Sequence, residues 1–209
     1  MATATEPANP PIAPVEPAAG LFRISLDTYR QMGAAGLITR ADRVELLDGL
    51  LVTKMTKGPR HVLSTLALMR WMTIHLPAGF HPRMEAPVEL RRGPEGDSSP
   101  EPDLTVVRGA MTDYRDRHPA AADVLLVVEV ADSSLRHDRQ GLRRYAHAGI
   151  PTVWIVNLRA GTVEVYTDPS GPAADPGYAT KATRAVGGVL DLSLDGHRLA
   201  GPPVADLLG

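Results

Sequence analysis

Three acidic residues stand in or beside segments with strand-like patterns, and they are the first candidates for chemistry. They are Glu45 in the segment 44–47, Asp103 just before the segment 104–107, and Glu129 inside the aliphatic run 124–130. A carboxylate in a buried strand is costly unless it is paired or binds a cation. Mg²⁺ and Mn²⁺ bind carboxylate oxygens and complete their coordination with water and substrate phosphate. Such an ion activates water and neutralises phosphodiester charge, so the set is suited to phosphodiester hydrolysis.

Each of these residues also has a simpler interpretation. Glu45 alone reads as a solvent-facing glutamate, and Asp103 alone reads as an aspartate that caps a turn. Acidic residues near strand ends are common, so their spacing is a weak signal by itself. Hydrolysis of another phosphate ester stays open as well, although the sequence has no Gly-rich phosphate loop to support it.

The segment 123–157 contains the elements that must position Glu129. The continuous β-branched run 124–130 predicts a strand buried on both faces. Residues 135–148 have apolar side chains at helical spacing, and Gly149 and Pro151 end this predicted helix. A second strand follows at 152–156. A βαβ unit of this kind places its two strands parallel in one sheet, with Glu129 near the C-terminal end of a central strand.

The remaining pattern predicts an α/β protein with a mixed central sheet, flanking helices and additional hairpins. The predicted elements are a helix at 26–33 capped by Ser25, a hairpin of 44–47 and 50–52 around Asp48-Gly49, a helix from Pro59 to near Pro77, strands at 84–90 and 104–107, a partly helical connection at 108–122, a strand at 162–166 paired with 152–156, and short strands near 178–182, 189–191 and 197–199 that close one edge.

Basic residues gather on the predicted helix 135–148. Arg136, Arg139 and Arg144 are candidates for contact with nucleic-acid phosphates, and His61, in the first turn of the earlier helix, is a fourth. The alternative interpretation is a solvated helix face for the arginines and a capping or surface position for His61. Both interpretations stay open from the sequence.

Composition limits the class of protein. The chain has 209 residues, 44% of them hydrophobic, and is long enough for one substantial core, so we expect a single domain at 21–209 after a disordered Pro/Ala-rich tail at 1–20. The formal net charge of −2 gives no global attraction to nucleic acid. The absence of cysteine excludes disulfides and thiolate metal sites. Without a signal peptide or an apolar run of membrane-spanning length, we expect a cytoplasmic protein with no membrane partner.

Several motifs resemble, in order and spacing, those of the Uma family of restriction endonuclease-like proteins, a domain of unknown function in the PD-(D/E)XK nuclease-like superfamily. They are VELLDGLLV, PRH at the start of a helix, PEPDLTVV, VLLVVEVADSSLRHD and RRYAHAGIPTVWIVN. The resemblance implies a restriction-endonuclease-like fold and cleavage of DNA with Mg²⁺ or Mn²⁺. It also implies that Asp103 and Glu129 are the principal metal ligands, with Glu45 as an additional ligand or as a residue that binds a metal-bound water. Asp132 and Asp138 match further acidic positions of the family.

The lysine of the family motif is missing from this sequence. Ala131 occupies its usual position, and Gly141 occupies the helix position where a basic residue commonly substitutes for it. Losing such an electrostatic group costs roughly 10²- to 10³-fold in rate. Arg143 is our candidate for a replacement in catalysis, and Arg139, Arg144, Lys54 and Lys57 are the alternatives. A nuclease fold that is weakened or inactive, and that serves as a binding or assembly module, is the rival hypothesis.

Duplex cleavage favours a homodimer, because each chain offers one active site and a duplex has two strands.

Overall fold

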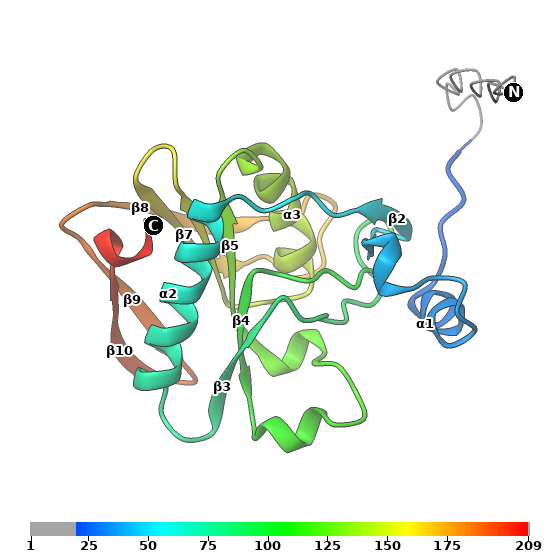
Figure 1. Cartoon of the computed structure of the whole chain (residues 1–209), viewed down its shortest axis with the longest axis horizontal. Coiled ribbons are helices and arrows are strands. Elements are labelled where there is room, and N and C mark those ends of the chain that lie inside the picture. The colour runs from blue at the N-terminus through cyan, green and yellow to red at the C-terminus, as the bar shows by residue number, and fades with distance from the viewer. Residues whose placement is uncertain (1–19, 209) are drawn as a thin grey trace, which may run out of the picture.

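The fold is built around a six-stranded mixed sheet. The computed structural model describes residues 20–208, so the predicted tail, apart from Gly20, lies outside the described residues. The strands lie in the order β3-β4-β5-β6-β7-β8 (Figure 1). Their bounds are Phe80–Met84 for β3, Leu104–Arg108 for β4, Val124–Ala131 for β5, Thr152–Asn157 for β6, Thr162–Pro169 for β7 and Tyr178–Ala185 for β8. The α/β fold class expected from the sequence is confirmed.

The predicted βαβ unit is present at the centre of this sheet. Strands β5 and β6 pair in parallel, and helix α3, Leu135–His147, connects them. The other neighbouring strands pair antiparallel, including β6 with β7 as expected. Side chains alternate between the two faces of a strand, so Glu129 shares its face with Val127 and Ala131. That face packs against α3, because Val127 and Ala131 belong to the same buried cluster as Tyr145.

Different elements cover the two faces of the sheet. Helix α2, Pro59–His75, packs on the face opposite α3, together with the separate hairpin of β9, Val189–Leu194, and β10, His197–Pro203 (Figure 1). Trp154 is fully buried in the cluster under α2. Short 3₁₀ helices occur at Arg40–Asp42, Met111–Tyr114, Ala121–Asp123 and Val204–Leu207. Among residues 20–208, no helix has the length and apolar character needed to span a membrane.

The N-terminal part forms a separate wall at one end of the molecule (Figure 1). Helix α1, Leu26–Ala34, begins at Ser25, whose side chain accepts a hydrogen bond from the Thr28 backbone N–H as predicted. Strands β1, Val44–Leu47, and β2, Leu50–Thr53, form the predicted hairpin. Its turn residues Asp48 and Gly49 have φ values of 52° and 77°. These positive values are what a tight two-residue turn requires.

Two predictions about strands were inaccurate. The strand predicted at 84–90 lies earlier in the chain, because β3 comprises Phe80–Met84 and Glu85 leaves the strand conformation with a φ of 47°. The prediction followed the alternation of residues 84–90, whereas the strand of the structure includes Pro82, because β3 is an edge strand, where a missing N–H is tolerated. The C-terminal segments do form strands, but only β8 lies at the edge of the main sheet. Strands β9 and β10 pair with each other instead.

Candidate active site

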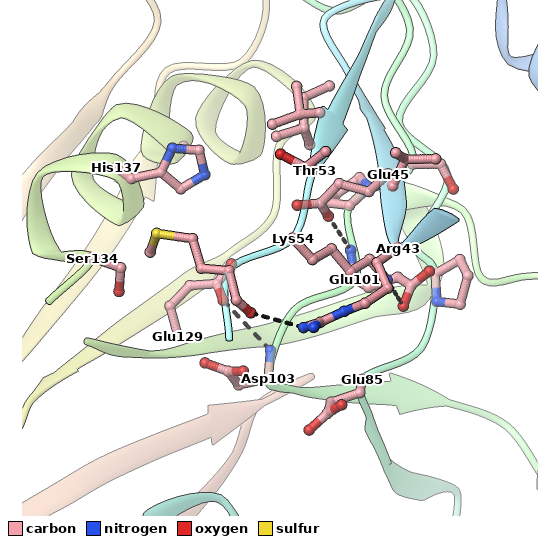
Figure 2. Close-up of a pocket in the computed structure, with 18 of the residues that line it drawn as sticks. Arg43, Glu45, Thr53, Lys54, Glu85, Glu101, Asp103, Glu129, Ser134 and His137 are labelled. Atoms are coloured by element: carbon pink, nitrogen blue, oxygen red, sulfur yellow. Dashed lines mark hydrogen bonds and ion pairs between the residues drawn. The ribbon is translucent and has the colours of Figure 1, made fainter. Parts of the chain in front are cut away.

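A cleft of about 1240 Å³ lies between the N-terminal wall and the end of the central sheet. Its walls come from the β1–β2 hairpin, the loop from Lys54 to Gly58, the C-terminal end of β5 and one side of α3. Glu45, Asp103 and Glu129 all line it, as do Glu85 and Glu101 (Figure 2). The fold therefore gathers into one cleft three carboxylates that are widely separated in the sequence.

Asp103 is the most heavily bonded carboxylate of the cleft and is only 7% exposed. Its Oδ1 accepts a hydrogen bond from Lys57 Nζ at 2.7 Å. Its Oδ2 accepts from the Val130 backbone N–H at 2.7 Å and lies 3.0 Å from His61 Nε2. Burial alone would raise the pKa of Asp103, but the hydrogen bond from His61 and the charge of Lys57 lower it below its ordinary value. The side chain is thus a fixed, ionised carboxylate.

Glu129 lies beside Asp103 at the end of β5. The Tyr145 hydroxyl donates to Glu129 Oε1 at 2.7 Å, and the Asp103 backbone N–H donates to Oε2 in a long contact of 3.5 Å. Burial, followed by the negative charges of Asp103 and Asp138, raises the pKa of Glu129 well above its ordinary value. Burial likewise raises the pKa of Asp138 to about 6. Two carboxyl groups at this end of the cleft therefore hold their protons more tightly than usual, and a bound cation would favour their ionised forms.

Glu45 faces the same cleft from β1 but has a different partner. Its Oε2 accepts a hydrogen bond from the Glu101 backbone N–H at 2.9 Å, and burial raises its pKa. The Glu101 carboxylate itself pairs with Lys54 (Figure 2). Glu129 therefore contacts the backbone of Asp103 itself, whereas Glu45 accepts a hydrogen bond from the backbone of Glu101, two residues earlier.

The predicted basic residues separate into two groups. His61 contacts Asp103, and Arg144 lines the cleft, where it donates to Asp48 Oδ2 at 2.7 Å. By contrast, Arg136, Arg139 and Arg143 are not among the residues that line the cleft. Arg139 pairs with Glu164 on β7, and Arg143 Nε lies 3.5 Å from the exposed Asp175.

The rotation of α3 explains this separation. Its cleft-facing residues are Ser134, His137, Asp138, Gly141, Arg144 and Tyr145, which recur at intervals of three and four. Successive residues of an α-helix are about 100° apart around the axis. Arg143 therefore points away from the face to which Arg144 and Gly141 belong. We correct the assignment of Arg143 to catalysis on this ground.

The sequence and the fold were compared with those of known proteins. The family model described as "Uma2: Putative restriction endonuclease" matches residues 26–195, which include all the carboxylates of the cleft. The chain belongs to the Uma2 family. No curated protein matches the sequence. The fold of this Uma2 chain is also similar to that of a solved structure from Anabaena variabilis, titled a putative nuclease belonging to DUF820. The TM-score is 0.64 and the sequence identity is 15%, and the match covers 88% of this chain and 97% of that chain.

Sequence reasoning missed part of the Uma2 site. No chemical role was expected for Tyr145, which donates to Glu129, or for Glu85, whose Oε1 lies 3.1 Å from Lys57 Nζ. The signal for Tyr145 was its placement sixteen residues after Glu129 on the returning helix of the βαβ unit. Glu85 carried no comparable signal, because its strand was predicted in the wrong place.

The donor set of this Uma2 chain fits Mg²⁺ or Mn²⁺ through two carboxylates. Within residues 20–208, no group of three or more His, Cys, Asp or Glu side chains is arranged to hold a metal ion. Mg²⁺ does not need such a cage, since it usually binds one or two carboxylates and keeps several waters. The carboxyl groups of Asp103 and Glu129 are oxygen donors of the type that Mg²⁺ takes, and the negative charge of Asp103 contributes to the raised pKa of Glu129.

Proposed function

We propose that this protein is a metal-dependent hydrolase that cleaves phosphodiester bonds of DNA in this cleft. The observation that carries the proposal is that the buried Asp103 and the half-buried Glu129 lie side by side in the cleft. The Asp103 backbone N–H contacts the Glu129 carboxyl group, and the Lys57 ammonium donates to the Asp103 side chain. Membership of a family described as restriction endonucleases supports DNA as the substrate. Asp103 and Glu129 would hold Mg²⁺ or Mn²⁺, and Glu45 is proposed as an additional ligand or a partner of a metal-bound water.

The residues around these carboxylates orient and charge the site. His61 and the Val130 N–H fix Asp103 from one side, and the Tyr145 hydroxyl fixes Glu129 from the other. A bound divalent ion would lower the pKa of a water molecule and neutralise charge on the phosphate. His137 is exposed on the cleft face of α3, where it is available to DNA phosphates, whereas Arg144 on the same face is paired with Asp48.

The reaction is an addition of water to phosphorus. A new P–O bond forms to the water oxygen and one P–O ester bond breaks, which leaves a phosphate monoester and an alcohol. The attacking water loses one proton to solvent, and the departing alkoxide takes one from solvent. We also propose that duplex DNA is cleaved by a homodimer, because one chain supplies one such site.

Two observations favour a second function. The described residues contain no three-residue metal group, and the motif positions Ala131 and Gly141 carry no charge. A protein with the nuclease fold but without hydrolysis would bind DNA or a protein partner through the same cleft. Only a measurement of turnover separates the two functions.

The proposal is tested by incubating supercoiled plasmid and linear DNA with the purified protein in Mg²⁺, Mn²⁺ or EDTA. We expect nicked or linear products with either metal and none in EDTA. Asp103→Asn and Glu129→Gln should each remove the activity, whereas Asp175→Asn, a carboxylate outside the cleft, should retain it. Cleavage that persists in both cleft variants would refute the assignment, and a wild type that cuts no DNA would favour the non-hydrolytic function.

A further inference from the structure

Lys57 brings a positive charge to the carboxylates from an element that the family motif does not use. It lies in the loop between β2 and α2, and its Nζ is 2.7 Å from Asp103 Oδ1 and 3.1 Å from Glu85 Oε1. An ammonium group has three N–H donors. Two are directed to these carboxylates, so one donor stays available for a further oxygen in the cleft.

We infer that Lys57 is a catalytic residue whose ammonium contacts the phosphate group under attack beside Asp103. The inference rests on the proposed function. When water adds to phosphorus and an ester bond breaks, negative charge increases on the non-bridging phosphate oxygens. Lys57 keeps its proton throughout and stabilises this charge through its free N–H, which is the electrostatic contribution that an uncharged Ala131 or Gly141 does not make.

Three other cations that line the cleft have partners elsewhere. Lys54 pairs with Glu101, Arg144 donates to Asp48, and the Arg43 guanidinium donates to the Met55 carbonyl oxygen at 3.3 Å. None of these three contacts Asp103 or Glu129 in the described structure. Lys57 is half-buried and, among the lysines and arginines of the described residues, it is the one that pairs with Asp103, next to the imidazole of His61.

Position 141 offers a way to test whether catalysis depends on the positive charge of Lys57 or on the conformation of the loop that carries it. It lies on the cleft face of α3 with helical backbone conformation. A Cβ at this position would meet Arg144 Nη2 at 3.5 Å and Tyr145 Cε2 at 3.8 Å, which are ordinary contacts. A side chain can therefore start there without a clash, and a lysine at 141 would enter the same cleft as Lys57.

The experiment compares four variants of the full chain: Lys57→Met, the double variant Lys57→Met/Gly141→Lys, the matched double variant Lys57→Met/Gly141→Ala, and Arg198→Met, an exposed cation of β10 outside the cleft. We expect Lys57→Met to lower kcat for Mg²⁺-dependent DNA cleavage by roughly 10²- to 10³-fold. The lysine at 141 should recover at least about tenfold, the alanine at 141 should recover nothing, and Arg198→Met should stay within about threefold of the wild type. Calorimetric Mg²⁺ binding and thermal unfolding establish that each variant keeps its site and fold.

A second readout does not depend on turnover. The affinity for a fluorescent oligonucleotide in EDTA should fall about fivefold to tenfold in Lys57→Met, the loss of one charge-assisted contact, and return with the lysine at 141. Wild-type cleavage rates in Lys57→Met, or equal rates with lysine and alanine at 141, would overturn the inference while the proposed function stands. A wild type that cleaves nothing overturns the proposed function and the catalytic role together, and unchanged oligonucleotide affinity in Lys57→Met would then exclude the phosphate contact as well.

Discussion

Replacing Glu164 by glutamine should destabilise the protein at neutral pH and far less in acid. Glu164 lies on β7 and is 5% exposed. It accepts hydrogen bonds from Arg139 Nε at 3.0 Å, the Tyr166 hydroxyl at 2.6 Å and Lys181 Nζ at 3.0 Å. Burial acts to raise the pKa of Glu164, but these three partners lower it from 4.5 to about 2. The variant tests whether these contacts, including the one from Arg139 on α3 to β7, stabilise the fold.

The magnitude follows from this pKa. One pKa unit corresponds to about 1.4 kcal/mol, so the full effect on the free energy of unfolding would be roughly 3 kcal/mol. Arg139 and Lys181 have side chains 46% and 44% exposed. Solvent screening of these partners reduces the expected loss in Glu164→Gln to about 2 kcal/mol.

The pH dependence has a definite sign. Because the folded pKa lies below the unfolded one, the stabilisation is complete above pH 4.5 and is lost as the pH falls toward 2. Urea unfolding at pH 7 and pH 3 measures it, with Asp175→Asn as a control that should leave the unfolding free energy unchanged. We expect the difference between wild type and Glu164→Gln at pH 3 to be roughly half of that at pH 7 or less. An equal difference at both pH values, or less than about 0.5 kcal/mol at pH 7, would refute the reasoning.

Three further predictions concern the elements that shape the cleft. Arg144→Met leaves the partly buried Asp48 carboxylate without the partner that lies 2.7 Å away, and should cost about 1.5 kcal/mol in urea unfolding; a loss below about 0.5 kcal/mol would contradict a stabilising ion pair. Gly49→Ala should lower the free energy of unfolding by more than about 1 kcal/mol, because φ is 77° and the new Cβ would lie 2.6 Å from Arg23 Cβ; Gly36→Ala, with no atom within 4 Å, should cost less. Tyr145→Phe removes the donor to Glu129 and should weaken Mg²⁺ binding about tenfold in calorimetry, and an unchanged affinity would exclude this positioning role.

Patterns that repeat along the chain predicted most of the fold. The aliphatic run of β5, the helical spacing of α3 and the Gly-Ile-Pro segment that ends it define the βαβ unit without any knowledge of its neighbours. Asp48-Gly49 likewise determined the hairpin, because the turn demands positive φ at both residues. Edge strand β3 was predicted too late in the chain because residues 84–90 alternate, and the edge position that tolerates Pro82 inside the strand is a property of the sheet as a whole.

The composition of the cleft was less accessible from the sequence. Asp103 and Glu129 could be named from their strands and motifs, and their contact follows from the pairing of β4 with β5. Lys57 and Tyr145 reach these carboxylates from separate elements, so their roles depend on how α2 and α3 pack on opposite faces of the sheet. The arginines of α3 could not be separated from the sequence for a similar reason. Arg144 lines the cleft and Arg143 does not, because adjacent residues of a helix point about 100° apart, and the sequence does not say which side of the helix faces the cleft.

The most direct test of the account is calorimetric titration of the wild type, Asp103→Ala and Glu129→Ala with Mg²⁺ and Mn²⁺. The central claim is that this carboxylate pair holds a divalent ion. We predict binding to the wild type at millimolar or lower ion concentration and loss of binding in both variants, with Asp175→Ala binding as the wild type does. Absence of binding to the wild type, or binding that survives in Asp103→Ala and Glu129→Ala, would contradict the account.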